Sequence, residues 1–277
     1  MQKKIFFQWE KWAYSHYVWL QVAKKFNIDE KNVIWVFSFK DLFESVVNNK
    51  WIWIVPIENS YAWSVHENFY HLSKFPIKII WEYYLEIKHC LLGLTDDIKK
   101  IKKAYSHYQA LMQCEKFLEN HNIEPVVWWD TATSAKYIMN QKNPSYACIA
   151  SKLCAKLYWL NILKENIADQ SWNTTRFFVV IPEEFYTNEA NPQKTSIVFS
   201  VKDMPAVLYK CLGAFATRNI NLTKIESLPT RKWKFEYMFW LDFENSWNDL
   251  VNWALNELSF FAKDIKILWS YNLIVKL

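Results

Sequence analysis

The stretch IFFQWEKWAYSH, from Ile5 to His16, decides how the start of the chain folds. Its apolar run Ile5-Phe6-Phe7 is typical of a short buried strand, and a helical pattern follows it. A turn between a strand and a helix usually contains glycine, because glycine adopts positive φ at little cost and lets the backbone approach a ligand. Here Trp9 and Trp12 occupy that turn instead.

The composition suggests an explanation for these tryptophans. The 277 residues include 2 Gly and 17 Trp, whereas glycine makes up about 7% of an average protein. The two counts together match the usual glycine share. Some bacterial lineages decode UGA as glycine, while a common translation table writes that codon as tryptophan. We therefore interpret most of the tryptophans as glycines, with one of Trp128 and Trp129 genuine; the alternative is a tryptophan-rich protein.

Charge, cysteine and histidine patterns argue against several classes of protein. The 33 basic and 28 acidic residues are spread along the chain, so no basic block indicates a nucleic-acid interface. Five cysteines without a C-x-x-C pair argue against disulfides and zinc, and the six histidines form no i, i+4 pair. The first apolar run is too short for a signal peptide, and no apolar segment of membrane-spanning length follows. We expect a cytoplasmic protein without a metal, a membrane or a nucleic-acid partner.

Short β-rich runs alternate with helical patterns over the first two thirds of the chain, which is typical of an α/β sheet. The predicted strands are 4–7, 33–37, 52–57, 77–92, 102–105, 124–127, 146–149 and 176–181. Residues 182–194 are polar, lack periodicity and contain two prolines, which predicts a linker. The region 195–277 then has the order β-α-β-β-α-β of a ferredoxin-like fold.

Six stretches resemble motifs of bacterial prephenate dehydratases, in the same order and spacing. They are VPIENSYAWSVHE (55–67), IKHCLLG (87–93), AYSHYQALMQC (104–114), DTATSA (130–135), ACIASKLCAKLYWL (147–160) and NTTRF (173–177). The later segments KTSIVFSVKDMPAVLYK (194–210) and NLTKIESLPTR (221–231) resemble the regulatory ACT domain of these enzymes. The family has glycine where this sequence has Trp9, Trp12, Trp53, Trp63, Trp81, Trp159 and Trp269.

The resemblance implies an enzyme that removes water and carbon dioxide from prephenate to give phenylpyruvate, on the route to phenylalanine. Aromatisation of the ring drives that reaction, so no cofactor is implied. The implied catalytic region is α/β, with two lobes that resemble type II periplasmic binding proteins and a cleft between them. We expect this region at 1–181, with lobes 1–78 plus 165–181 and 79–164. A linker at 182–194 and a ferredoxin-like ACT domain at 195–277 follow, and the ACT sheet suggests a homodimer or homotetramer.

The resemblance also assigns residues to the site. Thr175 matches the threonine of the T-R-F motif and is expected to donate a hydrogen bond to the departing hydroxyl. Arg176 is expected to pair with a substrate carboxylate or to brace the motif from behind. Asn59 and Ser60 can donate to an anion, while Glu58 and Asn173 have supporting roles. Further contacts are expected at strand-to-helix junctions, although each of these residues is as well explained as a helix cap: Ser15, Ser106, His107, Gln109, Thr131 and Ser151.

One histidine next to a cysteine needs separate treatment. His89 and Cys90 could suggest a nucleophilic pair, but adjacent residues on a strand point to opposite faces. We therefore interpret His89 as structural.

Phenylalanine is the effector that the ACT resemblance implies. The segments matching the effector site contain Ala206, Val207, Leu208, Asn221, Leu222, Glu226 and Ser227. The sequence departs from the family pattern where Ala206 replaces glycine and Leu228 replaces arginine, which removes a charge from the effector region. Two other functions stay open: an arogenate dehydratase, which differs only in substrate, and a non-catalytic module that binds small anions.

Overall fold

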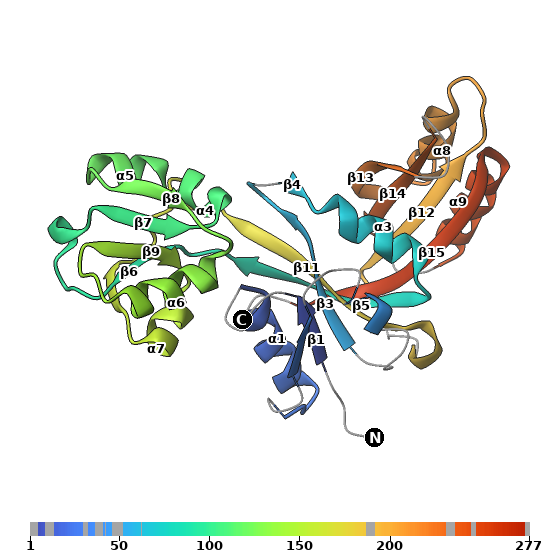
Figure 1. The fold of residues 1–277 in the computed structure, drawn as a ribbon. Helices are drawn as coiled ribbons and strands as arrows, with labels where there is room; N and C mark the ends of the chain where they lie inside the picture. Colours follow the sequence, from blue (N-terminus) through green and yellow to red (C-terminus); the bar gives the residue numbers. More distant parts are fainter. Residues whose placement is uncertain are drawn as a thin grey trace.

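The computed structural model describes residues 5–8, 14–29, 33–36, 41, 43–45, 52–61, 63–186, 192–230, 236–244 and 248–274. These residues form a ten-stranded and a five-stranded sheet. Figure 1 shows the five-stranded sheet with its helices at one end of the molecule, while the ten-stranded sheet runs from the middle to the other end. Within the described part of the chain, no helix is both long and apolar enough to cross a membrane.

The middle of the molecule is a mixed sheet covered by a helix on each face. Its strands, in the spatial order β5-β11-β3-β1-β2, are β5 (Ile77–Glu86), β11 (Thr174–Pro182), β3 (Ile52–Asn59), β1 (Ile5–Gln8) and β2 (Val33–Val36). Alternate side chains of β3 enter different cores, because successive residues of a strand point to opposite faces. Ile54 packs in the cluster that contains residues of α1 (Tyr14–Lys25), and Val55 packs in the cluster that contains residues of α3 (His66–Lys74).

The five-stranded sheet forms a second lobe between β5 and β11 in the sequence. Its spatial order is β10-β6-β9-β7-β8, with β10 (Asn161–Lys164), β6 (Cys90–Gly93), β9 (Tyr146–Ala150), β7 (Lys103–Ser106) and β8 (Glu124–Val127). Its helices are η2 (Ile98–Lys100), α4 (Tyr108–Met112), α5 (Glu115–Asn120), α6 (Thr131–Gln141) and α7 (Lys152–Tyr158).

The chain enters this lobe at residues 87–89 and leaves it at 165–173, and these two crossings bond to each other. Ile87 N donates to Asn173 O (2.8 Å), and Ile167 N donates to His89 O (3.0 Å). The strand predicted at 77–92 is therefore two strands, because the chain changes sheets at residues 87–89. The lobe boundary expected at residues 78 and 79 falls inside β5, which pairs with β11 throughout its length.

Residues 194–274 form a third unit, here called the C-terminal module. It contains β12 (Lys194–Val201), α8 (Val207–Ala216), β13 (Asn221–Pro229), β14 (Tyr237–Glu244), α9 (Asp249–Phe261) and β15 (Ala262–Ile274), in the predicted β-α-β-β-α-β order. A separate apolar core lies between its helices and its sheet. A short helix, η3 (Glu183–Phe185), and the described end of the predicted linker precede it.

The C-terminal module is joined to the central sheet rather than tethered beside it. The end of β15 pairs in parallel with β5, with Asn272 opposite Trp81, so the strands of both units form one sheet. One apolar cluster contains Phe178 of β11 together with Trp240 and Tyr271 of the module. The side chains next to β11 therefore include residues from the far end of the sequence.

Candidate active site

Thr175 lies directly opposite Asn59 because β11 and β3 are antiparallel and pair in that register. Asn59 Nδ2 donates to Thr175 Oγ1 (2.9 Å) and to Asn173 Oδ1 (2.8 Å). Asn59 Oδ1 accepts from the backbone N–H of Tyr61 (3.0 Å), which fixes which way the amide points. Thr175 Oγ1 is thus an acceptor towards Asn59, and its own proton remains available to donate elsewhere.

The hydrogen bonds continue from Asn173 into the second lobe. Asn173 Nδ2 donates to Gln113 Oε1 (2.8 Å), and the same oxygen lies 2.7 Å from His89 Nε2. His89 Nδ1 lies 3.0 Å from the hydroxyl of Tyr14, on α1. Asn173, Gln113 and His89 are all buried. Tyr14, His89 and Gln113 were not among the predicted site residues, because only the fold brings these three side chains into contact with one another.

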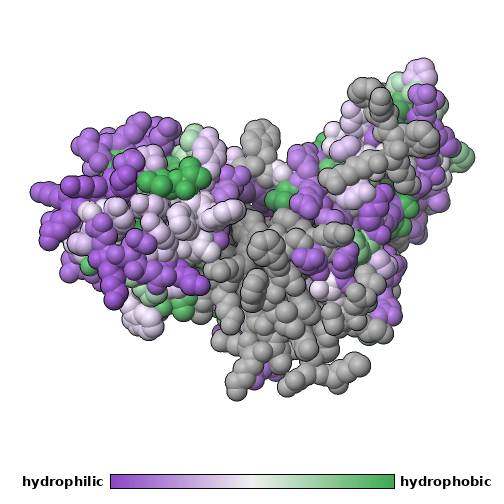
Figure 2. All heavy atoms as spheres, viewed as in Figure 1, coloured by the Kyte–Doolittle hydropathy of each residue, from purple (hydrophilic) through white to green (hydrophobic). Residues whose placement is uncertain are grey.

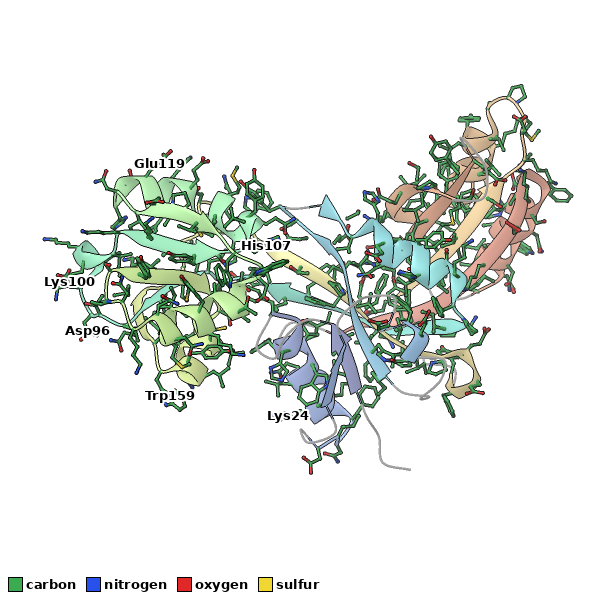
Figure 3. All side chains as sticks on the ribbon, viewed as in Figure 1. Lys24, Asp96, Lys100, His107, Glu119 and Trp159 are labelled. Carbon is green, nitrogen blue, oxygen red and sulfur yellow. The ribbon has the colours of Figure 1, made fainter. Side chains whose placement is uncertain are left out.

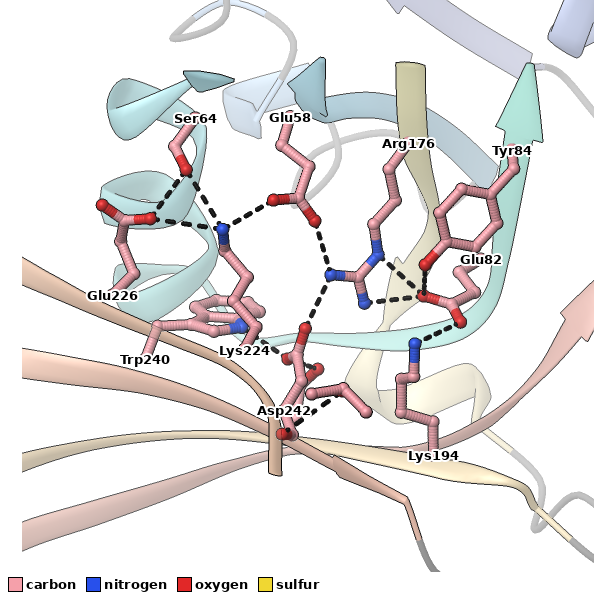
Figure 4. A network of polar contacts seen from close by, with 12 residues as sticks. Glu58, Ser64, Glu82, Tyr84, Arg176, Lys194, Lys224, Glu226, Trp240 and Asp242 are labelled. Carbon is pink, nitrogen blue, oxygen red and sulfur yellow. Dashed lines mark hydrogen bonds and ion pairs between the residues drawn. The ribbon is translucent and has the colours of Figure 1, made fainter. Parts of the chain in front are cut away.

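Arg176 follows Thr175 and is expected on the opposite face of β11. Figure 4 shows its guanidinium among the carboxylates of Glu58, Glu82 and Asp242. Its Nε donates to Glu82 Oε2 (2.7 Å), and its Nη1 donates to Glu58 Oε1 (2.9 Å) and to Asp242 Oδ2 (2.7 Å). Its Nη2 donates to the hydroxyl of Tyr271 (3.2 Å). Since protein groups surround the guanidinium, the geometry favours the bracing role of Arg176 over a contact with a substrate carboxylate.

Glu58 connects this group of acids to the C-terminal module. Its carboxylate accepts from Arg176 and, at 2.6 Å, from Lys224 Nζ of β13. Burial by itself would raise the pKa of Glu58, but the two cations outweigh that effect and hold the pKa below its ordinary value. Lys224 also contacts Glu226 (3.2 Å), and Ser64 Oγ of β4 (Trp63–Ser64) donates to Glu226 Oε2 (2.7 Å). Glu58, which directly precedes Asn59, is therefore bonded to β13, the strand that contains the predicted effector residues Glu226 and Ser227.

Two of the predicted serines have their hydroxyls occupied by backbone groups. Ser60 Oγ donates to Trp172 O (2.9 Å) and accepts from Thr174 N (2.9 Å), which ties the end of β3 to the start of β11. Ser106 is fully buried, and its Oγ donates to Ile149 O (2.7 Å). Both serines therefore hold strands together in this structure.

The remaining predicted residues lie at helix starts around the junction between the lobes. Figure 3 shows His107 at the end of the second lobe that faces the central strands, where its Nδ1 accepts from Gln109 N (3.3 Å) and caps α4. Gln109 itself is exposed, and burial lowers the pKa of His107, which Asp130 partly offsets. Thr131 is the first residue of α6, which Asp130 caps. His107 therefore serves as a helix cap in this structure, whereas Thr131 does not cap α6.

A pocket of about 270 Å³ lies between α1 and α7, where the two lobes meet. Its walls include Tyr14, Glu86, Ser151 and Lys152. Ser151 is buried beside Cys154, and Ser15 is buried one residue after Tyr14. The structure thus brings the starts of α1 and α7 to the junction between the lobes.

Figure 2 shows that the surface is also hollowed between the second lobe and the C-terminal module.

The predicted effector residues are divided between a helix start and an edge strand of the module. Ala206 has φ 57°, a left-handed conformation that favours glycine, and it directly precedes Val207 and Leu208 at the start of α8. Asn221, Leu222, Glu226 and Ser227 lie on β13. Leu228 is buried in the apolar cluster that contains Trp240, so it fills the core beneath this strand.

Among the residues that the structure describes, no three His, Cys, Asp or Glu side chains are grouped so that they could hold a metal ion. The fold and the site define a multi-lobed α/β protein in which a positioned threonine hydroxyl lies near the junction of two lobes. A family model described as prephenate dehydratase matches residues 5–184. The chain belongs to the prephenate dehydratase family.

Curated relatives support this assignment. Over 250 residues the chain is 39% identical to arogenate dehydratase/prephenate dehydratase 1 of Arabidopsis thaliana, which covers 83% of this chain and 64% of that protein. Over 251 residues it is also 39% identical to the prephenate dehydratase of Methanocaldococcus jannaschii, with 89% and 90% covered. The chain thus spans slightly less than two thirds of the length of the plant relative.

Solved structures share the whole architecture. The prephenate dehydratase of Arthrobacter aurescens in complex with L-Phe has a TM-score of 0.87 and 26% identity, over 97% of this chain and 90% of that one. A protein described as GqqA, a novel type of quorum quenching acylase, has a TM-score of 0.84 and 26% identity, over 99% of both chains. Two activities are therefore described for this architecture, so the assignment for this chain depends on its site.

Proposed function

We propose that this chain catalyses the dehydration and decarboxylation of prephenate to phenylpyruvate, in phenylalanine biosynthesis. The observation that carries the proposal is the hydrogen bond from Asn59 to Thr175 Oγ1, which leaves the threonine proton free to donate. A donor at this point stabilises the negative charge that develops on the departing ring hydroxyl. As the C–O bond breaks, the electron pair of the bond to the ring carboxylate enters the ring. Carbon dioxide leaves, and the hydroxyl departs with a proton as water.

The substrate has two carboxylates, and candidate donors for them surround the junction between the lobes. Ser15, His107, Gln109, Thr131 and Ser151 stand at helix starts, where the positive end of the helix dipole favours anions. Arogenate carries an amino group in place of the keto group of prephenate, and nothing in this site chemistry separates the two. Arogenate therefore remains an alternative substrate. The family assignment argues against a module that only binds small anions.

The test of the proposed reaction is the release of phenylpyruvate from prephenate, with the release of phenylalanine from arogenate assayed in parallel. Thr175→Ala should lower kcat by about 10²–10³-fold, the size of effect seen when one oxyanion-type donor is removed. Thr175→Ser keeps the hydroxyl and should retain much of the activity. Thr174→Ala is the matched control, because this neighbour points to the other face of β11. An alanine variant at position 175 with nearly full kcat would contradict the assignment.

We also propose that the two-lobed region 1–181 is the catalytic domain, that 182–194 is a linker and that 195–277 is an ACT-type regulatory domain. The β-α-β-β-α-β order supports this division, as does the L-Phe complex of the similar Arthrobacter aurescens enzyme. Phenylalanine would then be a feedback effector of a cytoplasmic homodimer or homotetramer. The same phenylpyruvate assay with and without phenylalanine tests the regulation, and an unchanged rate over a broad concentration range would contradict it.

A further inference from the structure

Five side chains connect Thr175 to α1 through both crossings between the lobes. Tyr14 belongs to α1, His89 to the first crossing, Gln113 to the second lobe, Asn173 to the second crossing, and Asn59 to β3. Each consecutive pair is joined by a hydrogen bond of 2.7–3.0 Å. Water has little access to the middle of this chain, since His89 is 2% exposed and Asn173 is also 2% exposed. Its members must therefore satisfy one another.

The direction of donation in this chain is fixed from the end near Thr175. The backbone N–H of Tyr61 can only donate, so it holds Asn59 Oδ1 as an acceptor and turns Nδ2 towards Asn173 and Thr175. Asn173 then accepts through Oδ1 and must donate through Nδ2 to Gln113 Oε1. Gln113 Oε1 is thereby an acceptor on both of its contacts.

His89 consequently has to donate through Nε2. If Nε2 carried a lone pair, it would face the lone pairs of Gln113 Oε1 at 2.7 Å, which is repulsive. Turning the Gln113 amide would only move the conflict to Asn173, and turning Asn173 would move it to Asn59. Turning Asn59 would leave the Tyr61 N–H without its acceptor. One orientation therefore satisfies the whole chain.

We propose that His89 is a positioning residue for Thr175: its Nε2–H fixes the Gln113, Asn173 and Asn59 amides, so that Asn59 donates to Thr175 Oγ1 and the threonine proton points to the leaving group. This inference rests on the proposed function, because it assigns a task to the hydroxyl of Thr175. It differs from a general acid or base role, since His89 exchanges no proton with substrate.

The surroundings of His89 fit a fixed donor. Burial lowers the pKa of the His89 imidazole, which the bond with Gln113 partly offsets, so the ring is neutral at neutral pH. The hydroxyl of Tyr14 donates to Lys88 O (3.0 Å) and lies equally close to His89 Nδ1, so with the His89 proton on Nε2 its one proton is shared between these two acceptors. Burial raises the pKa of Tyr14 well above its ordinary value, so that hydroxyl keeps its proton. The position of the imidazole proton therefore follows from Gln113 Oε1, which accepts on both of its contacts, and not from Tyr14.

Two variants separate positioning from packing. His89→Leu removes the donor and should lower kcat about tenfold, the order of one lost hydrogen bond, with KM changed by less than about twofold. His89→Gln can place an amide N–H towards Gln113 and should recover most of kcat. His121→Leu is the control, because that histidine is exposed on the second lobe. Equal losses in both His89 variants, or full kcat in His89→Leu, would overturn the positioning role.

NMR of nitrogen-labelled histidine in the full-length wild-type protein tests the orientation without an activity assay or a variant. We expect the His89 signal to show the neutral form with its proton on Nε2, and a proton on Nδ1 alone would overturn the inference. Wild-type protein that forms neither phenylpyruvate from prephenate nor phenylalanine from arogenate would contradict the proposed function instead. The NMR result would then still decide whether the hydrogen-bonded chain has the direction described.

Discussion

At the scale of single residues, Trp159 carries the clearest sign that a tryptophan stands for glycine. It follows α7 with φ 50° and ψ 42°, and its side chain is 83% exposed and points outwards (Figure 3). A left-handed conformation costs a non-glycine residue roughly 1–2 kcal/mol, and helices often end with glycine there. Trp159→Gly should therefore raise the free energy of unfolding by about 1 kcal/mol, measured by chemical denaturation.

We propose that glycine is native at most tryptophan positions, in which case the mass of the natural protein falls below 33.5 kDa.

The control for Trp159→Gly is Trp129→Gly. Trp129 is 86% exposed and does not have positive φ, so glycine there gains nothing in the folded state and adds freedom to the unfolded chain. Equal changes in stability for the two variants would show that the loss of an exposed indole, and not the backbone conformation, is responsible. Trp240 differs from both exposed tryptophans, because its indole is buried and its Nε1 donates to the buried carboxylate of Asp242.

At the scale of elements, one lysine of β15 holds the end of α3. Lys266 Nζ donates to the carbonyls of Leu72 and Ser73 (3.0 Å each) and of Phe75 (2.6 Å). Burial, together with Lys78 and Lys74, lowers the pKa of Lys266 from 10.5 to about 8. Between these two values the unfolded chain holds more protons than the folded protein, so this residue contributes more stability as the pH rises.

The free energy of unfolding should therefore increase in wild type relative to Lys266→Met as the pH rises from about 8 to 10.5. The expected size is about 1.4 kcal/mol for each unit by which the two pKa values differ. Chemical denaturation at several pH values measures it, and a difference that does not change with pH would contradict the lowered pKa. Lys263→Met is the control, because Lys263 is exposed and its ion pair with Glu236 should matter little.

The sequence alone predicted most elements but fewer of the contacts between them. The β-α-β-β-α-β order of the C-terminal module follows from local periodicity, which needs no knowledge of partners. The break of 77–92 into two strands was missed, because an apolar run does not show where a chain changes sheets. The role of Arg176 stayed undecided between two alternatives, since its partner Asp242 lies 66 residues away. His89 was interpreted as structural because it cannot pair with the adjacent Cys90, and its contact with Gln113 was missed because only the folded chain brings Gln113 to its ring.

At the scale of the whole molecule, Asp242 is the point where the C-terminal module supports the T-R-F strand. Asp242 is fully buried, and its carboxylate accepts a hydrogen bond from Arg176 (2.7 Å), the residue that follows Thr175 on β11. Asp242→Asn leaves the guanidinium short of one charge partner, and such a loss inside a protein costs about 3–5 kcal/mol. We expect a drop of that size in the free energy of unfolding, with a lower kcat because β11 is no longer held.

Glu244→Gln provides the matched control for this prediction. Glu244 lies on the same strand, β14, but it is exposed, and its side chain bonds to Asn221 at the surface of the module. Its substitution should change the free energy of unfolding by less than about 1 kcal/mol. An Asp242→Asn protein as stable and as active as this control would show that the module does not support the catalytic strand.

The bonded crossings between the lobes also bear on the order in which the chain folds. Thr174 pairs with Glu86, so this contact of β11 with β5 closes a loop of nearly ninety residues. Residues 90–164 can complete their own sheet first, since the strands of that sheet all come from this segment. Once that lobe exists, its two ends lie side by side, as the bond from Ile167 N to His89 O shows. The long loop is then replaced by a compact body, and β11 needs to search only a short distance for β5.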